Sequence, residues 1–222
     1  SRVARMETDE LVAEMVLPLV IRIERDEPPT RTDALEAAAR AVLLMLTTDV
    51  ADWQPAVTRW DGQRIRKVVR RARGANWERA AALPGLDVRS GTAQVRVYPP
   101  IEVDAWPPEL LRLQVGGTDL DDPTAPSAPP TGEPLILLSP ELAMSAGKAM
   151  AQAGHAAQLG WRAASRPFRE AWRAADFPLA VRDATRAQWR DAIAAGAPVV
   201  HDGGFTEVAP GSQTALALLP RR

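Results

Sequence analysis

The sequence predicts an α/β protein of three-layer α/β/α architecture, with helices on both faces of a small sheet, in two tandem copies that pack as a pseudo-dimer. Three observations lead to this prediction. Short β-branched apolar runs alternate with Ala-rich helical segments, two stretches of the chain resemble each other, and a Pro-rich segment separates these stretches.

The first half begins with an apolar run, PLVIRIER at 18–25, which predicts a strand. The Ala-rich segment DALEAAARAVLLML follows and predicts a helix. Both return near an offset of 116 residues, as PLILLSPE at 134–141 and then KAMAQAGHAAQLGW. Each half therefore starts with the same strand and helix.

The resemblance continues through the rest of each half. Residues 64–91 align with DFPLAVRDATRAQWRDAIAAGAPVVHDGG at an offset of 112, so that Trp60 matches Trp172 and Trp77 matches Trp189. We interpret this as an internal duplication, in which each copy runs strand, helix, helix, strand, helix, strand. The alternative is that any two such units look alike in a chain rich in Ala and Arg.

Between the halves lies GGTDLDDPTAPSAPPTGEP, in which Pro, Gly, Ser and Asp displace the apolar pattern. Such a composition is typical of an extended linker. We therefore expect a degenerate α/β repeat at 1–115, a linker at 116–133 and a second domain at 134–222. A chain that carries its own pseudo-partner would be a monomer.

Composition excludes several classes of protein. With 46% hydrophobic and 25% charged residues, the 222-residue chain has the composition of a soluble globular protein, and no apolar run is long enough to span a membrane. The chain has no Cys and two His, His155 and His201, so we expect no disulfide, no metal site and no cofactor. The polar start SRVARMETDE lacks the apolar stretch of a secretory signal, so we expect a cytoplasmic protein.

A dense basic run, RWDGQRIRKVVRRARGANWER at 59–79, is a candidate contact for a phosphate backbone. Its candidate substrate-binding residues are Arg66, Lys67, Arg70 and Arg71. Equally, the run could be a strand and a helix whose outer faces are solvated by Arg.

One helix carries an unusual lysine. The chain has only two Lys, and Lys148 lies at the start of an Ala- and Gly-rich helix, where the macrodipole disfavours a positive charge. Ser145 is a plausible N-cap, which puts Lys148 in the first turn. Lys148, Gln152 and His155 form one stripe along the helix because they are four and three residues apart.

The second polar cluster is VVHDGGFTEVAPGSQTALALLP. A strand end delivers Asp202 into a Gly-Gly turn, Thr206 follows, and a Pro-Gly loop leads to Thr214 at the start of the last strand. A carboxylate that orients water, an ammonium that stabilises an oxyanion and two hydroxyls can form a hydrolytic site. By spacing alone, a turn with a capped strand is the more common interpretation.

The first copy lacks this constellation. Thr32 stands at the position of Lys148, Ser90 at that of Asp202 and Ala39 at that of His155. A set of residues with a purely structural role would have less reason to be lost together.

Two blocks resemble the type II peptidyl-tRNA hydrolases, the archaeal and eukaryotic class. They are PLILLSPELAMSAGKAMAQAGHAA and HDGGFTEVAPGSQTALALLP, and with the intervening helix end IAAGAPVV they span about residues 134–220. The resemblance implies a mixed four-stranded sheet flanked by helices. It also implies hydrolysis, without a metal, of the ester that joins a peptide to the 3′ ribose of tRNA.

On this resemblance the family's functional positions are Lys148, Gln152, Asp202, Thr206 and Thr214, with His155 at a position less clearly catalytic. Lys148, Asp202, Thr206 and Thr214 are the candidate catalytic residues, and Gln152 and His155 would bind substrate. The chain departs from the family in several places: Glu207 stands where Gln is usual, Gly203 replaces a common Ala, and Met150 and Gly154 replace smaller or polar residues. Glu207 would place a second carboxylate near Asp202.

Two other functions stay open at this point. One is a catalytically inactive tRNA- or RNA-binding module, with the Arg run at 64–73 as its main contact. The other is a protein-interaction module, because small domains with Pro-rich linkers often serve as adaptors.

Overall fold

The computed structural model describes residues 12–204 and 207–221, which form two β-sheets. The sheet of the N-terminal unit (residues 12–115) contains β1 Met15–Arg22, β2 Lys67–Ala72, β3 Leu86–Ser90, β4 Ala93–Val97 and β5 Ile101–Glu102. The sheet of the C-terminal unit (residues 134–221) contains β6 Leu135–Leu138, β7 Ala180–Asp183, β8 Val199–His201 and β9 Gln213–Leu218.

The two sheets share one topology. The strand order is β2-β1-β4-β3 in one and β7-β6-β9-β8 in the other. In each sheet the first two strands in the chain are parallel, and the remaining two pairings are antiparallel. The mixed four-stranded sheet expected from the sequence is thus present in both units, and the arrangement is consistent with tandem copies. The N-terminal sheet differs by one short added strand, β5, which pairs with β1.

Seven α-helices and one 3₁₀ turn are found in the described residues. Those of the N-terminal unit are α2 Arg31–Leu46, the 3₁₀ turn Ala51–Trp53, α3 Gln54–Asp61, α4 Gly74–Ala81 and α5 Pro108–Leu111. Those of the C-terminal unit are α6 Ala146–Ala163, α7 Arg166–Ala174 and α8 Arg186–Ala194. Among residues 12–204 and 207–221, no helix is long and apolar enough to cross a bilayer.

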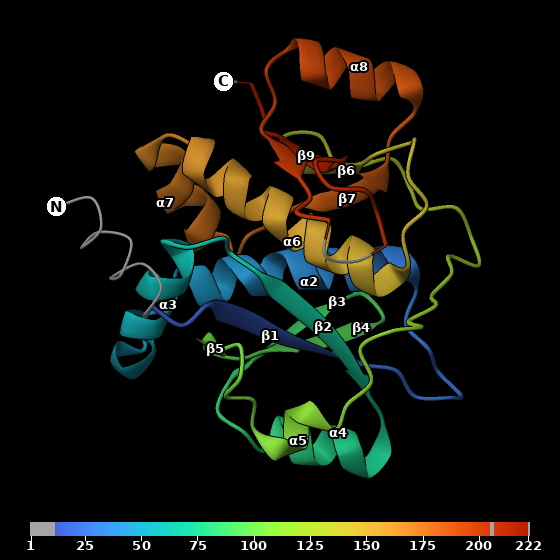
Figure 1. The fold of residues 1–222 in the computed structure, drawn as a ribbon. Coiled ribbons are helices and arrows are strands. Elements are labelled where there is room, and N and C mark those ends of the chain that lie inside the picture. The colour runs from blue at the N-terminus through green and yellow to red at the C-terminus, as the bar shows by residue number, and fades with distance from the viewer. Residues whose placement is uncertain (1–11, 205–206, 222) are drawn as a thin grey trace, which may run out of the picture.

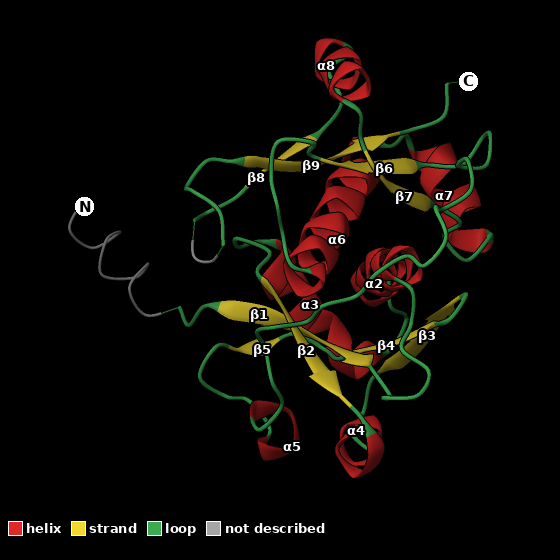
Figure 2. Ribbon diagram, turned by 90° about the vertical axis from the view of Figure 1, so that its right-hand side faces the viewer, coloured by secondary structure: helices red, strands yellow, loops and turns green. Residues whose placement is uncertain are grey.

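The two longest helices, α2 and α6, lie together between the sheets (Figure 1). Turned by 90°, the molecule shows α8 outside the C-terminal sheet and α4 and α5 outside the N-terminal sheet (Figure 2). Each sheet is therefore covered by helices on both faces, with the central pair shared. A helix with sheets and a second helix around it must be apolar on most faces, which explains why both are rich in Ala.

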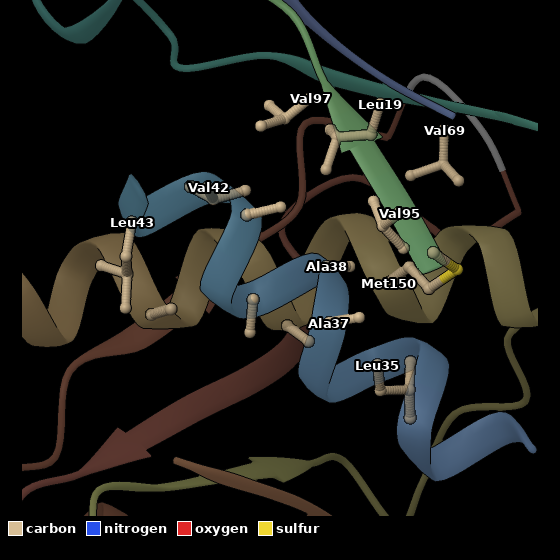
Figure 3. Packing of buried hydrophobic residues seen from close by; sticks show 14 of the residues in the cluster. Leu19, Leu35, Ala37, Ala38, Val42, Leu43, Val69, Val95, Val97 and Met150 are labelled. Atoms are coloured by element: carbon tan, nitrogen blue, oxygen red, sulfur yellow. The ribbon is translucent and has the colours of Figure 1, made fainter. Parts of the chain in front are cut away.

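One hydrophobic core joins the two units. Figure 3 shows part of it, with Ala38 and Val42 of α2 and Met150 of α6 among the buried side chains. A Cβ atom added at Gly154 would lie 2.6 Å from Cγ2 of Val42, so only glycine allows the helices to approach this closely here. The departures from the family pattern at Met150 and Gly154 thus lie at the contact between the units.

Matching tryptophans make matching contacts. The indole N–H of Trp60 donates to the carbonyl of Arg66, and that of Trp172 donates to the carbonyl of Pro178, both at 2.9 Å and both across six residues. Ile65 and Phe177 directly precede the two residues whose carbonyls accept these bonds, and both have positive φ. The alignment of Trp60 with Trp172 is therefore matched in three dimensions.

The segment between the units is held at several points. The Asp122 carboxylate accepts from the backbone N–H and the hydroxyl of Thr32 at the start of α2. The carbonyl of Thr118 accepts from Ala146 N at the start of α6. The Pro-rich segment thus contacts the N-termini of both central helices.

Candidate active site

The start of α6 positions the first candidate residue. Ser145 is the N-cap of α6, as predicted, and its hydroxyl accepts from the backbone N–H of Lys148 at 3.2 Å. Glu207 completes the cap from a distant loop, because its carboxylate accepts from Ser145 N at 2.8 Å and also from the Ser145 hydroxyl. A carboxylate at a helix N-terminus interacts favourably with the macrodipole. The expected second carboxylate is therefore bound to the helix cap.

The loop after β8 positions Asp202. Its backbone N–H donates to Ser212 O and its carbonyl accepts from Gly211 N, so the two ends of the loop 202–212 are tied together. The Oδ2 atom accepts from the backbone N–H of Gly204 at 2.8 Å. This bond orients the carboxylate toward α6.

Lys148 and Asp202 form an ion pair with Nζ and Oδ1 2.6 Å apart. Their side chains are only 10% and 7% exposed, so this pair is largely removed from water. A buried charge without a partner is very unfavourable, whereas a paired and hydrogen-bonded one is tolerated. The carboxylate of Asp202 thus offsets the unfavourable position of Lys148 in the first helical turn.

Two further polar residues, Gln152 and Thr214, extend the hydrogen-bond network of this pair into the protein interior. Gln152 donates from Nε2 to Asp202 Oδ1 at 3.4 Å, and its Oε1 accepts from the hydroxyl of Thr214. Gln152 is buried and Thr214 is fully buried. Thr214 is therefore linked to Asp202 through the Gln152 amide. It lies one residue further from the cavity than its predicted catalytic role would require.

A cavity of about 720 Å³ lies beside the pair and has walls from both units. The C-terminal unit contributes Ser145, Gly147, Lys148, Ala151, Gln152, His155, His201, Asp202, Gly203 and Glu207. The N-terminal unit contributes Glu14, residues 64–69 and Val115, and the segment between the units contributes Gly116. Both lysines of the chain, Lys67 and Lys148, line this one cavity.

The stripe predicted along α6 faces the cavity, since Lys148, Gln152 and His155 all line it. Burial, together with the nearby cations Lys67, Arg162 and Lys148, lowers the pKa of His155 to about 3. The imidazole is therefore neutral at physiological pH. It can donate or accept a hydrogen bond, but it adds no positive charge.

Lys67 is tied to the interface between the units. Its Nζ donates to Ile65 O and to Gln158 Oε1, both at 2.9 Å, and lies 5.1 Å from the centre of the Trp60 ring. Burial, and secondarily Arg162, holds the pKa of Lys67 well below its usual range. The lysine thus joins β2 to α6 while its side chain lines the cavity.

The structure separates the four predicted basic residues. Arg66 and Lys67 line the cavity, whereas Arg70 and Arg71 are not among its lining residues. Arg70 donates to the carbonyls of Leu111 and Leu113 and stacks on Trp106, and Arg71 donates to Gly117 O. These two arginines hold the segment that follows α5. Thr206 lies outside the described residues.

Several lining residues were not expected from the sequence. Ile65, Val68, Val69 and Val115 belong to the half that lacks the polar constellation, and Gly116 belongs to the segment between the units. No local pattern marks them, because their role depends on packing between segments that are far apart in the chain. Only the predicted pseudo-dimer hinted that the first half would lie near the site.

The described residues contain no group of three or more His, Asp or Glu that could hold a metal ion. What lies at the cavity wall is a carboxylate, an ammonium and a buried amide. This set can orient a water molecule and stabilise negative charge on an oxygen.

Comparison with known families gives one finding. Residues 135–222 match the model of the family described as peptidyl-tRNA hydrolase PTH2, so the resemblance seen in the C-terminal half is confirmed. The match contains Lys148, Gln152 and Asp202, and it covers all four strands of the C-terminal sheet, β6 to β9. A comparison with curated protein sequences gives no significant match.

Proposed function

We propose that the C-terminal unit, which carries the peptidyl-tRNA hydrolase PTH2 domain, hydrolyses the ester between a peptide and the 3′ ribose of tRNA. The family supports this activity for the domain as a class. The single observation on which the proposal depends is the Lys148–Asp202 pair, 2.6 Å apart at the wall of a cavity.

In the proposed reaction Asp202 orients a water molecule and accepts its proton as the water oxygen attacks the ester carbonyl carbon. The carbonyl oxygen becomes an oxyanion, which the Lys148 ammonium stabilises. The bond to the ribose 3′ oxygen then breaks, and this oxygen takes the proton from Asp202. The products are a tRNA with a free 3′ hydroxyl and a peptide carboxylic acid, which releases its remaining proton to the solvent to become a carboxylate.

Gln152 and Thr214 act as positioning residues. The Thr214 hydroxyl donates to the Gln152 carbonyl oxygen, which fixes the amide so that its N–H group points to Asp202. The carboxylate is thereby held by three donors, from Lys148, Gln152 and Gly204. A carboxylate fixed in this way needs little reorganisation when the reaction begins. A catalytic role for Thr206 stays a prediction.

The substrate's phosphates need positive charge near the cavity. Arg64 and Arg66 line it from the N-terminal unit, so we propose that they contact the 3′ end of the tRNA. Neutral His155 is suited to a hydrogen bond with the ribose or the ester rather than to an ion pair with phosphate.

The test is hydrolysis of a peptidyl-tRNA by the wild-type chain and by Asp202→Asn. We expect Asp202→Asn to lose about 10² to 10³ in kcat, because the amide neither accepts the proton nor balances Lys148. Asp191→Asn is the matched control, because it makes the same substitution at an exposed position of α8, and it should keep the wild-type rate.

The two other functions give different results in this assay. Salt-sensitive tRNA binding without ester cleavage by the wild-type chain would favour the inactive RNA-binding module. Absence of any tRNA binding at low salt would favour a protein-interaction module.

A further inference from the structure

An edge strand bounds the cavity on the side of the N-terminal unit. β2 stands at the end of the strand order β2-β1-β4-β3, and residues 64–69, which include its first half, line the cavity. Figure 1 shows β2 in front of β1, with α6 above it. One long side of β2 is therefore turned away from its sheet.

The parallel ladder determines which peptide groups of β2 face this free side. Leu17 N donates to Arg66 O and Ile23 N donates to Ala72 O, so the even-numbered residues of β2 bond to β1. In a parallel pair, alternate residues direct their N–H and C=O groups to the same neighbour. The peptide groups of Lys67, Val69 and Arg71 consequently point outward.

The outward side already forms one backbone pairing. Arg71 N donates to Gln114 O at 3.0 Å in an antiparallel bridge, after which the chain diverges through Val115 and Gly116, two residues that line the cavity. Across residues 12–204 and 207–221, Gln114 is the only backbone partner on this side of β2. Lys67 and Val69 thus present two N–H and two C=O groups at the cavity wall.

Apolar and charged side chains both line the cavity near this edge. Ile65, Val68 and Val115 of the N-terminal unit and Ala151 of α6 are apolar, and they lie beside the basic residues of segment 64–67. Free strand groups combined with apolar side chains are the means by which proteins bind an extended peptide through its main chain. Main-chain bonds of this kind depend little on the side chains of the bound peptide.

We propose that the peptide part of the substrate binds as an added β-strand along the free edge of β2, bonded to the backbone of Lys67 and Val69, with its ester end at Lys148 and Asp202. This inference rests on the proposed function for the identity of the ligand. It assigns the N-terminal unit a role in the reaction, because that unit holds the peptide while the C-terminal unit cleaves the ester.

The test uses binding rather than cleavage. The probe is an N-acetylated tetra-alanyl chain joined by a stable amide to 3′-amino-3′-deoxyadenosine, and its Kd is measured with the full chain. In a series of probes each peptide N–H is replaced in turn by an ester oxygen. An added strand directs alternate N–H groups to its neighbour, so we expect about tenfold weaker binding at every second position and less than a twofold change between them. A loss that is the same at all positions, or absent at all, would overturn the proposal.

A protein variant tests the same bonds from the other side. Val69→Pro removes an outward N–H but no donor to β1, since proline is tolerated on an edge strand where the N–H faces away from the sheet. The tetra-alanyl probe should bind about tenfold more weakly, and the acetyl-alanyl probe, which lacks the further residues that would extend along β2, should be affected much less. Equal weakening for both probes would contradict the proposal.

Failure of the proposed function has a different signature. If the wild-type chain cleaves no peptidyl-tRNA but the alternating pattern is found, the peptide groove stands and the hydrolase proposal falls. If cleavage is normal and the pattern is absent, the groove proposal alone is wrong.

Discussion

The two units of the chain share the four-stranded topology but differ at the connection between the third and fourth strands, β3 and β4 in one unit and β8 and β9 in the other. In the N-terminal unit β3 and β4 are joined by only Gly91 and Thr92, and the Asp33 carboxylate at the start of α2 accepts from the N–H and hydroxyl of Thr92. In the C-terminal unit the loop 202–212 takes the place of this turn.

The difference determines what lies at the start of each central helix. The short turn closes directly on its helix, and a Cβ atom at Gly91 would lie 2.4 Å from Asp33 Oδ2. The long loop also reaches its helix, through Asp202 and Glu207, but Lys148 and Asp202 line an open cavity there. The same scaffold thus carries a closed structural contact in one copy and a candidate reaction site in the other.

The largest expected effect concerns the helix position that differs between the units. Lys148→Ala should lower kcat for peptidyl-tRNA hydrolysis by about 10² to 10³, because the oxyanion loses its stabilising charge. Thr32→Ala, at the α2 position that the sequence alignment pairs with Lys148, should leave the rate within twofold of wild type. Counted from the N-caps Thr30 and Ser145, the α2 residue that matches Lys148 in the structure is Asp33, so the sequence alignment was wrong by one residue here. Steady-state kinetics of the purified variants measures both, and near-normal turnover in Lys148→Ala would refute the assigned role.

Lys148→Arg sharpens this comparison. The planar guanidinium cannot occupy the space of the compact ammonium beside Asp202, so we expect this variant to fail as well. A site that needed only positive charge would tolerate it.

The second prediction compares glycines in the two connections. Gly91 has φ of +51° and no space for a Cβ, so Gly91→Ala should lower the free energy of unfolding by about 2–3 kcal/mol through backbone strain and displacement of Asp33. Gly211, with φ of +79° and open space around it, should cost only about 1 kcal/mol when changed to Ala. Urea denaturation measures both, and equal losses would argue against a tighter fit in the hairpin.

The pH dependence of the unfolding free energy should depend on His155, which the sequence alignment pairs with Ala39 of the other unit. The pKa of His155 is about 3 in the folded chain and near 6.5 when unfolded. Between these values the unfolded state binds the extra proton, so the stability contributed by neutral His155 is lost as pH falls below about 6.5. The loss should be on the order of 1–2 kcal/mol at pH 5.

His155→Gln should flatten this acid limb of the unfolding free energy, while His201→Gln, at an exposed position, should leave it in place. Thermal unfolding between pH 4.5 and 7.5 tests this. An unchanged slope in His155→Gln would mean that another group causes the acid sensitivity.

The smallest effect tests what the units share. Trp60→Phe and Trp172→Phe each remove one indole N–H from a partly buried carbonyl partner at the same spacing. Each should lower the free energy of unfolding by about 1 kcal/mol, and the two losses should agree within about 0.5 kcal/mol. A large difference between them would break the structural equivalence of the two units.

Much of this could be predicted from periodicity and local chemistry. The strand and helix order, the Ser145 cap and the stripe of Lys148, Gln152 and His155 follow from spacing along single segments, and the family match confirms the resemblance of the C-terminal half. The partners of Glu207 and Arg70 could not be predicted, because they come from distant parts of the chain. The added strand β5 was missed because two residues are too few to give a pattern.

The cavity wall from the N-terminal unit was the least predictable feature. Val69 and Val115 are ordinary apolar residues in the sequence, and only the packing of α2 against α6 brings them to the site. Similarity between the halves indicated that two units exist, but it contained no information on which edges would meet.

The shared core of α2 and α6 gives this site an unusual independence from protein concentration. Where two separate chains must associate to form a cleft, dilution separates the chains and the cleft is lost. Here both walls belong to one polypeptide, so their association is intramolecular. Because the two units are parts of one chain, they need not be identical, and only one of them carries Lys148 and Asp202.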